Sequence, residues 1–139
     1  MHSRNQPIIT YASAAKLVSS AIAHAEENGW AVAVAVVDPG GAVLASGRMD
    51  GVVPPIHDFA VDKAFTAALG KPTLAFNERM ASGKELELGL VNRPRLCAWE
   101  GGLPIRENGT VIGAIGVSGA AGPEDGACAA AALENLGLG

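Results

Sequence analysis

The chain has 139 residues, a formal net charge of −4 and a 49% hydrophobic composition, which is enough apolar material for a buried core. This length suits one domain, so we expect residues 1–139 to form a single domain, with residues 1–9 as a mobile N-terminal extension. No lysine and arginine cluster is present to displace counterions from phosphates, which argues against a nucleic-acid partner. No uninterrupted apolar run of about 20 residues is present, so no segment is expected to enter a membrane.

The cysteines and the first residues both favour a cytoplasmic protein. Cys97 and Cys128 lie among small apolar residues and form no disulfide framework. The N-terminal stretch contains Pro7 and several polar side chains, but it lacks the apolar centre of a signal peptide. We therefore expect the protein to reside in the cytoplasm.

The first element predicted along the chain is a helix that begins at Thr10 or Ser13. Apolar residues recur within it at helical spacing, and Asn28-Gly29 is a helix stop. In the next segment, Trp30–Val37, valines occupy one set of alternate positions and mostly alanines the other. Because neither set is polar, we expect this strand to be covered on both faces.

A turn, a second strand and a central helix are predicted next. Asp38–Gly41 has turn chemistry, and Ala42–Arg48 is expected to return as the partner strand of a hairpin. Pro55 is well placed to open a helix, because its missing N–H would be unpaired in the first turn anyway. The helix itself is predicted over Ile56–Leu69, and a shorter helix over Thr73–Ser82.

The last third of the chain returns to strands after an irregular or weakly helical segment at 83–94. The candidate strands are Leu96–Glu100, Leu103–Glu107 and Thr110–Ser118, and the last two flank Asn108-Gly109, a strong hairpin signal. Pro123 then opens a final helix with Ala127–Leu136 as its body. The order of elements predicts an α+β fold in which helices pack on a mostly antiparallel sheet of about five strands.

Polar side chains on the central helix are the first candidates for chemistry. His57 titrates near neutrality and suits a general base or a metal or haem ligand, although a structural histidine fits the helix start equally well. Lys63 suits a ligand carboxylate or an ion pair with an acidic side chain. Asp58 and Asp62 are four residues apart and suit a shared cation or an exposed acidic face.

The first helix and the second strand supply further candidates. His24 returns to the apolar face of its helix, where either a histidine at the core edge or a haem ligand fits. Arg48 suits a ligand carboxylate or a turn-stabilising pair with Asp50. No group of side chains has the spacing of metal ligands, so we expect no metal site other than haem iron.

Trp99 and Glu100 precede two glycines and form another candidate wall of a pocket. Trp99 suits stacking on a flat ligand or a place in the core, and Glu100 suits an acid, a base or an ionic partner for Lys63. Farther on, Gly113–Gly119 is a strand with repeated glycines, which indicates that backbone or ligand approaches it closely. Its spacing is not that of a dinucleotide-binding turn.

Several stretches taken together resemble one family. They are Val36–Gly41, Arg48–Gly51, Lys63–Ala68, Gly101–Ile105 and Val111–Gly119, followed by Asp125. The pattern is similar to the GlcG/HbpS family, also called the haem-degrading or DUF336 domain, which forms the C-terminal half of PduO-type cobalamin adenosyltransferases as well. The resemblance extends from about Ala12 to Leu136.

This resemblance implies a profilin-like fold with a five-stranded antiparallel sheet, assembly into homo-oligomers, and binding of haem or corrinoids. It also implies that Arg48, Asp50, Lys63 and Thr66 occupy family-typical positions near the ligand pocket. The chain departs from the usual pattern at two places. His57 stands where members commonly have a small residue, and Cys97–Glu100 replaces a segment that is commonly glycine-rich.

Three functions follow as alternatives. The leading one is a small-molecule binding protein of the haem or corrinoid type, with His57 or His24 as the possible iron ligand. The second is a cofactor-independent lyase, isomerase or dehydratase for a small catabolic intermediate, with His57 as base, Glu100 as acid, and Arg48 or Lys63 holding an anion. The third is an accessory subunit whose apolar helix faces serve oligomerisation.

Overall fold

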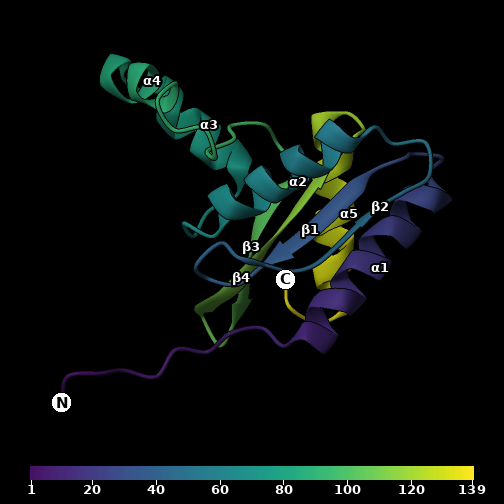
Figure 1. Cartoon of the computed structure of the whole chain (residues 1–139), viewed down its shortest axis with the longest axis horizontal. Helices are drawn as coiled ribbons and strands as arrows, with labels where there is room; N and C mark the ends of the chain where they lie inside the picture. Colours follow the sequence, from purple (N-terminus) through teal and green to yellow (C-terminus); the bar gives the residue numbers. More distant parts are fainter.

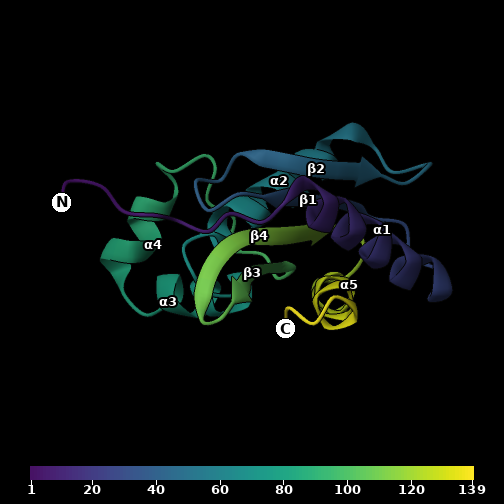
Figure 2. The same cartoon turned by 90° about the horizontal axis from the view of Figure 1, so that it is seen from below.

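A computed structural model describes residues 1–139. Its elements are α1 (Tyr11–Glu27), β1 (Ala33–Val37), β2 (Val43–Arg48), α2 (Pro54–Ala67), α3 (Thr73–Ala81), α4 (Lys84–Leu90), β3 (Gly102–Glu107), β4 (Thr110–Ser118) and α5 (Gly122–Asn135). The strands form one antiparallel sheet in the order β2-β1-β4-β3. Helices α1 and α5 cover one face of the sheet and α2 covers the other (Figures 1 and 2). None of the helices combines the length and apolar character needed to cross a membrane.

The α+β layout and the antiparallel sheet are as predicted, but the sheet has four strands instead of five. The expected strand Leu96–Glu100 is not part of the sheet. Side chains of neighbouring helices hold its backbone instead: Cys97 N–H donates to Thr66 Oγ1 at 2.8 Å, and Asn77 Nδ2 donates to the Ala98 carbonyl at 3.0 Å. With its polar groups engaged in this way, the segment forms a loop that runs beside α2.

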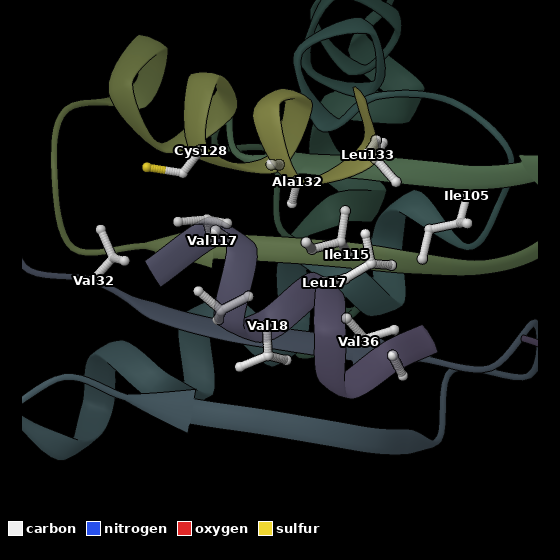
Figure 3. Close-up of a cluster of buried hydrophobic side chains, with 14 of the residues drawn as sticks. Leu17, Val18, Val32, Val36, Ile105, Ile115, Val117, Cys128, Ala132 and Leu133 are labelled. Atoms are coloured by element: carbon white, nitrogen blue, oxygen red, sulfur yellow. The ribbon is translucent and has the colours of Figure 1, made fainter. Parts of the chain in front are cut away.

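Strand β1 is buried along its whole length, which confirms that both of its faces are covered. Val34 and Val36 belong to the main core, together with side chains of α1 and α5 such as Leu17 and Leu133 (Figure 3). Ala33 and Ala35 face the other way and pack with α2. The alanine side chains of β1 therefore face α2, and the larger side chains of Val34 and Val36 face α1 and α5.

Two glycines bring the backbone of α2 against the sheet. Gly102 and Gly116 are opposite each other in the β3–β4 ladder. A Cβ atom at Gly116 would lie 2.1 Å from the Ala60 carbonyl oxygen, and one at Gly102 would lie 2.5 Å from the Lys63 carbonyl oxygen. Gly102 of β3 and Gly116 of β4 therefore allow a close approach of backbone, and this approach fixes the position of Lys63.

The ends of several elements follow the sequence signals. Thr10 caps α1 by accepting a hydrogen bond from Ser13 N–H at 3.1 Å. Asn108 and Gly109 have φ values of 51° and 78°, as the turn of the β3–β4 hairpin requires. Ile9 differs from the expected N-terminal extension, since it is 4% exposed and its N–H donates to the Ile112 carbonyl at 2.9 Å.

Helices α3 and α4 form an arm that projects from the rest of the molecule (Figure 1). Thr73 and Phe76 are the buried residues of α3, whereas α4 buries none. The segment expected to be irregular or weakly helical is thus a short helix at Lys84–Leu90. The arm leaves Leu88 and Val91 exposed.

Candidate functional site

A pocket of about 320 Å³ lies where β4 ends and α5 begins. Its walls come from α2, the loop before β3, the end of β4 and the first turn of α5. The lining residues are Ile56, Phe59, Lys63, Trp99, Glu100, Ser118, Gly119, Ala120, Gly122 and Asp125. We call this cavity the Trp99 pocket. It brings together Lys63, Trp99 and Glu100, three of the side chains that the sequence singles out.

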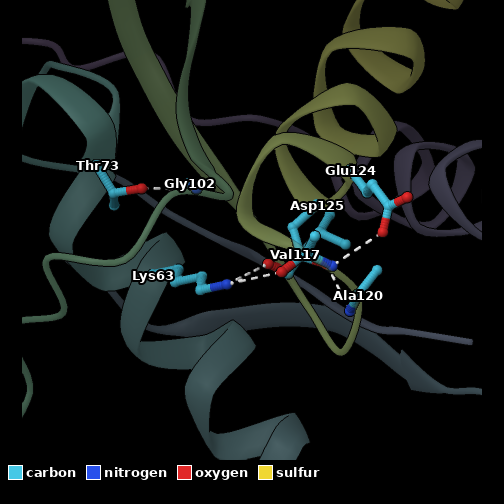
Figure 4. A network of polar contacts seen from close by, with 8 residues as sticks. Lys63, Thr73, Gly102, Val117, Ala120, Glu124 and Asp125 are labelled. Carbon is cyan, nitrogen blue, oxygen red and sulfur yellow. Dashed lines mark hydrogen bonds and ion pairs between the residues drawn. The ribbon is translucent and has the colours of Figure 1, made fainter.

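A buried ion pair crosses the inner wall of the Trp99 pocket. Lys63 Nζ lies 3.1 Å from Asp125 Oδ2, and each side chain is 3% exposed. The same ammonium group donates to the Val117 carbonyl at 2.9 Å, while Asp125 Oδ1 accepts from Ala120 N–H at 3.0 Å (Figure 4). The pair thereby joins α2 to the first turn of α5 across the end of β4.

Burial sets the electrostatics of this pair. Desolvation raises the pKa of the Asp125 carboxyl above its ordinary value, against the opposing effects of the Lys63 ammonium and the Ala120 N–H. Lys63 offsets the desolvation of Asp125, and its own charge is neutralised in return. Of the two alternatives for Lys63, the structure therefore shows the ion pair, with Asp125 as the partner instead of Glu100.

Glu100 is half-buried and its carboxylate has neither a hydrogen bond nor an ion pair within the chain. Its side chain lies against glycines of α5: a Cβ atom at Gly122 would be 3.3 Å from Glu100 Cβ, and one at Gly126 would be 3.0 Å from Glu100 Oε2. Glycine at both positions leaves room for the carboxylate beside the first turn of α5. The helix dipole favours a negative charge there.

Glu100 also lines a second cavity of about 320 Å³ on its other side. The residues of that cavity are Pro72, Leu74, Glu100, Gly101, Gly102, Leu103, Pro123, Gly126, Ala127 and Ala130. Glu100 is the one residue that lines both cavities, so it lies between them.

Aromatic side chains form the outer rim of the Trp99 pocket. The rings of Phe59 and Trp99 meet edge to face, with centroids 5.3 Å apart and planes at 88°. Trp99 is 58% exposed, so most of its indole is open to a ligand. The rim thus has an aromatic surface on which a flat ligand could stack, and the stacking role of Trp99 stays a prediction.

Thr66 anchors the loop that carries Trp99 and Glu100. Its side chain is buried, and its Oγ1 accepts from Cys97 N–H at 2.8 Å while donating to the Asp62 carbonyl at 2.8 Å. Burial raises the pKa of the nearby Cys97 thiol, which therefore stays protonated at neutral pH. Thr66 contributes to the pocket by holding this loop, since it does not line the cavity.

The structure places both candidate histidines outside the Trp99 pocket. His57 Nε2 lies 2.9 Å from Ser46 Oγ, on the side of α2 that faces β2. His24 lies on α1, with its ring 6.0 Å from that of Trp30 in an edge contact. His57 and Glu100 therefore do not line one cavity.

The remaining candidates also lie away from the Trp99 pocket. Arg48 donates from Nη1 to the Val52 carbonyl, which fastens the turn after β2, and it forms no ion pair with Asp50. Asp50 and Asp58 are exposed. For the Asp62 carboxyl, burial raises the pKa, Arg95 lowers it, and Asp58 raises it further.

Asp125 and Ser118 are pocket residues that the sequence does not single out as site residues. Asp125 reads in the sequence as an acid in the first turn of a helix, where the dipole alone explains it. Its pairing with Lys63 spans 62 positions in the chain. Lys63 and Asp125 both belong to the stretches that resemble the family, but this resemblance does not indicate that the two side chains are in contact.

A separate surface near α2 carries two arginines. A shallow cavity of about 490 Å³ is lined by Phe65, Leu69, Arg93, Pro94, Arg95 and Leu96. The Arg95 guanidinium carbon lies 3.8 Å from the centroid of the Phe65 ring, and Leu69 is 67% exposed. We call this surface the arginine groove.

Comparison with known proteins gives a consistent result. Residues 9–134 match the family described as haem degrading protein HbpS-like. Protein GlcG of Escherichia coli K12 is 36% identical over 116 residues, which is 83% of this chain and 84% of GlcG.

Solved structures agree with this match. The Klebsiella pneumoniae protein ORFY superposes with a TM-score of 0.91 at 34% identity, covering 99% of this chain and 96% of ORFY. A double mutant of Streptomyces reticuli HbpS superposes with a TM-score of 0.88 at 33% identity, covering 96% of this chain and 90% of HbpS.

Proposed function

The chain belongs to the HbpS-like family, and we propose that it binds a small organic molecule in the Trp99 pocket. The observation that carries this proposal is that Glu100, whose carboxylate has no partner in the chain, lines the cavity beside an exposed tryptophan and a buried ion pair. Pockets for small molecules typically combine apolar walls with a few fixed polar groups. A cavity of about 320 Å³ lies at the lower end of the sizes usual for such ligands.

Thermal unfolding in the presence of a library of small catabolic intermediates tests this proposal. A ligand is expected to raise the melting temperature of the wild-type protein, because it binds the folded state alone. The Trp99→Ala variant should lose that shift, whereas a Trp30→Phe variant, altered at the other tryptophan, should keep it. A ligand that stabilises Trp99→Ala as well as wild type would place its site elsewhere and contradict the proposal.

Haem is a second candidate ligand, because the family is described as haem degrading. The Trp99 pocket fits haem poorly: its lining includes no histidine, cysteine or methionine, and its one cation is already paired with Asp125. The arginine groove fits the periphery of haem better. Arg93 and Arg95 suit the two propionates, and the exposed Leu69 suits the apolar ring. When bound, haem would supply its own redox chemistry.

We therefore propose that any haem binding uses the arginine groove without an iron ligand from His57 or His24. In a haem titration followed by absorbance, Arg95→Gln should weaken a saturable Soret change. His57→Ala and His24→Ala should leave it unaltered. A Soret band abolished by either histidine variant would overturn this assignment, and it would name the iron ligand at the same time.

Acid–base catalysis in the Trp99 pocket is the enzymatic alternative, and it rests on Glu100. This carboxylate reaches the cavity, whereas His57 does not line it. For any reaction that the protein catalyses in this pocket, Glu100→Gln should abolish turnover while His57→Ala retains it. The opposite pattern would move the chemistry to the surface between α2 and β2.

Self-association is proposed for the projecting arm. Leu74, Leu88 and Val91 are 47%, 59% and 81% exposed there. A contiguous apolar surface usually marks an interaction site, and we propose that these side chains contribute to one. A second copy of this chain is the occupant that we propose, in line with the oligomers expected from the sequence.

A further inference from the structure

The charged groups around the Trp99 pocket are unequal in number. Its lining includes two acids, Glu100 and Asp125, but only one basic residue, Lys63. Lys63 donates to Asp125 Oδ2 at 3.1 Å and to the Val117 carbonyl at 2.9 Å. Asp125 therefore neutralises the ammonium charge before any ligand arrives.

Glu100 supplies the charge that remains. Its carboxylate has no partner in the chain, and Gly122 and Gly126 leave space for it beside the start of α5. The nearby Glu124 is already engaged, because its Oε1 accepts from Ala121 N–H at 3.0 Å. Glu100 is thus the one charged residue of the pocket lining that has no partner of opposite charge, and it leaves the pocket with one negative charge.

The aromatic rim of the pocket also favours a positively charged ligand. Trp99, with its indole largely open, and Phe59 lie at the mouth of the cavity. The face of an indole attracts cations, including quaternary ammonium groups, through its quadrupole. A carboxylate and an open tryptophan in one small cavity therefore favour the same class of ligand.

We propose that the Trp99 pocket binds an organic cation, namely a protonated amine or a quaternary ammonium group attached to a small flat or apolar group. This inference rests on the proposed function, since it assigns the ligand class of the same pocket. An anion would instead meet the Glu100 carboxylate. To pair with Lys63, an anion would have to displace Asp125 and leave that buried acid without its cation, which is strongly unfavourable.

Three probes that share a phenyl ring test the charge preference: benzyltrimethylammonium, benzyl alcohol and benzoate. Binding is followed by tryptophan fluorescence in a Trp30→Phe background, where Trp99 is the only indole. The cation is expected to quench Trp99 saturably and to bind at least tenfold more tightly than benzoate. Its binding should also weaken as salt is added, because part of it is electrostatic.

Glu100→Gln keeps the shape of the side chain and removes its charge. This variant should bind benzyltrimethylammonium at least tenfold more weakly, as loss of a charge-assisted contact predicts. Glu134→Gln changes an exposed acid near the C-terminal end of α5; it is the matched control and should bind like the parent protein.

The outcomes separate this inference from the proposed function. If benzoate binds as tightly as the cation, or if Glu100→Gln leaves cation binding unchanged, the charge preference is overturned while the pocket stands as a binding site. If none of the three probes alters Trp99 fluorescence, and no library ligand depends on Trp99, both the charge preference and the pocket are overturned.

Discussion

At the scale of single residues, Gly116 has the tightest surroundings among the glycines. A Cβ atom there would lie 2.1 Å from the Ala60 carbonyl oxygen and 2.5 Å from the Ala64 nitrogen. Both contacts are with the backbone of α2, which cannot turn aside as a flexible side chain can. Methyl-sized additions at this position must therefore push the helix away from the sheet.

Gly116→Ala is predicted to destabilise the protein by about 1–3 kcal/mol, the usual cost of overpacking a core. Gly89→Ala is the matched control, since Gly89 lies in the exposed helix α4 and a methyl group added there would have no neighbour within 4 Å. Alanine favours helix, so this control should be neutral or slightly stabilising. Urea denaturation measures both, and equal stabilities would show that α2 shifts without cost.

At the scale of elements, the Lys63–Asp125 pair is the polar link between α2 and α5. The two helices lie on different faces of the sheet, and the ammonium reaches Asp125 past the end of β4 (Figure 4). Burying both charges is tolerable only while each has the other. The arrangement of the two helices at the pocket therefore depends on both residues being present.

Lys63→Met is predicted to cost about 3–5 kcal/mol at pH 7, because it leaves a buried carboxylate without its cation. Adding Asp125→Asn should recover part of that loss, since asparagine is uncharged and can still accept from Ala120 N–H. Urea denaturation of the single and double variants provides the comparison. A double variant less stable than Lys63→Met would contradict the assignment of the loss to an unpaired charge.

The same pair of variants predicts a pH dependence. Burial raises the pKa of folded Asp125 above the ordinary value of 3.8, so above that pH the folded state holds more protons than the unfolded state. Stability of Lys63→Met should therefore rise as pH falls from 7 toward 4. The double variant has no carboxyl at this position and should lack that component of the slope.

The sequence predicts best those elements whose signals lie in residues close together along the chain. The hairpin at Asn108-Gly109 and the doubly covered strand β1 depend on neighbouring residues, and both are confirmed. The strand predicted at 96–100 is wrong because Thr66 and Asn77, about 20 to 30 positions away, hold the backbone of this segment. The residues within 96–100 themselves give no sign of these contacts with distant side chains.

In the candidate site too, single residues can be predicted from the local sequence, whereas contacts between distant residues cannot. Lys63, Trp99 and Glu100 are recognisable from residue type and setting, and they share one pocket. The pairing of Lys63 with Asp125 is not, because it depends on how two helices meet at the end of a sheet. His57 has an attractive residue type, but the direction of its helix face places it beside Ser46.

At the scale of the whole molecule, the α3–α4 arm is the part with the least support from the rest of the chain. Residues of α3 anchor it to α2 and β3, whereas α4 extends beyond them (Figure 2). A helix of this length is marginal alone in water, so a partner surface would stabilise it. This fits the proposal that a second copy packs on the arm.

The self-association proposed for the arm predicts that Leu88→Lys lowers the mass in solution, because a charge would enter the apolar contact between copies. Static light scattering after gel filtration gives the mass directly. Glu87→Lys, the adjacent exposed position on α4, is the control for added positive charge and should keep the parent mass. An unchanged mass in Leu88→Lys would exclude this residue from the subunit contact.

Glu100 also separates the two cavities that it lines. It stands between two cavities of about 320 Å³ each, with Phe59 on one side and Leu74 on the other. It is the one residue that lines both cavities, and Gly122 and Gly126 of α5 lie against its side chain. Alanine or glycine at this position removes the carboxylate between the cavities and leaves both partners of the Lys63–Asp125 pair in place. For the ligand class proposed above, this one change predicts the loss of the preference for a cation and more room for a longer, uncharged molecule, which gives evolution or a designer a short route to a new specificity.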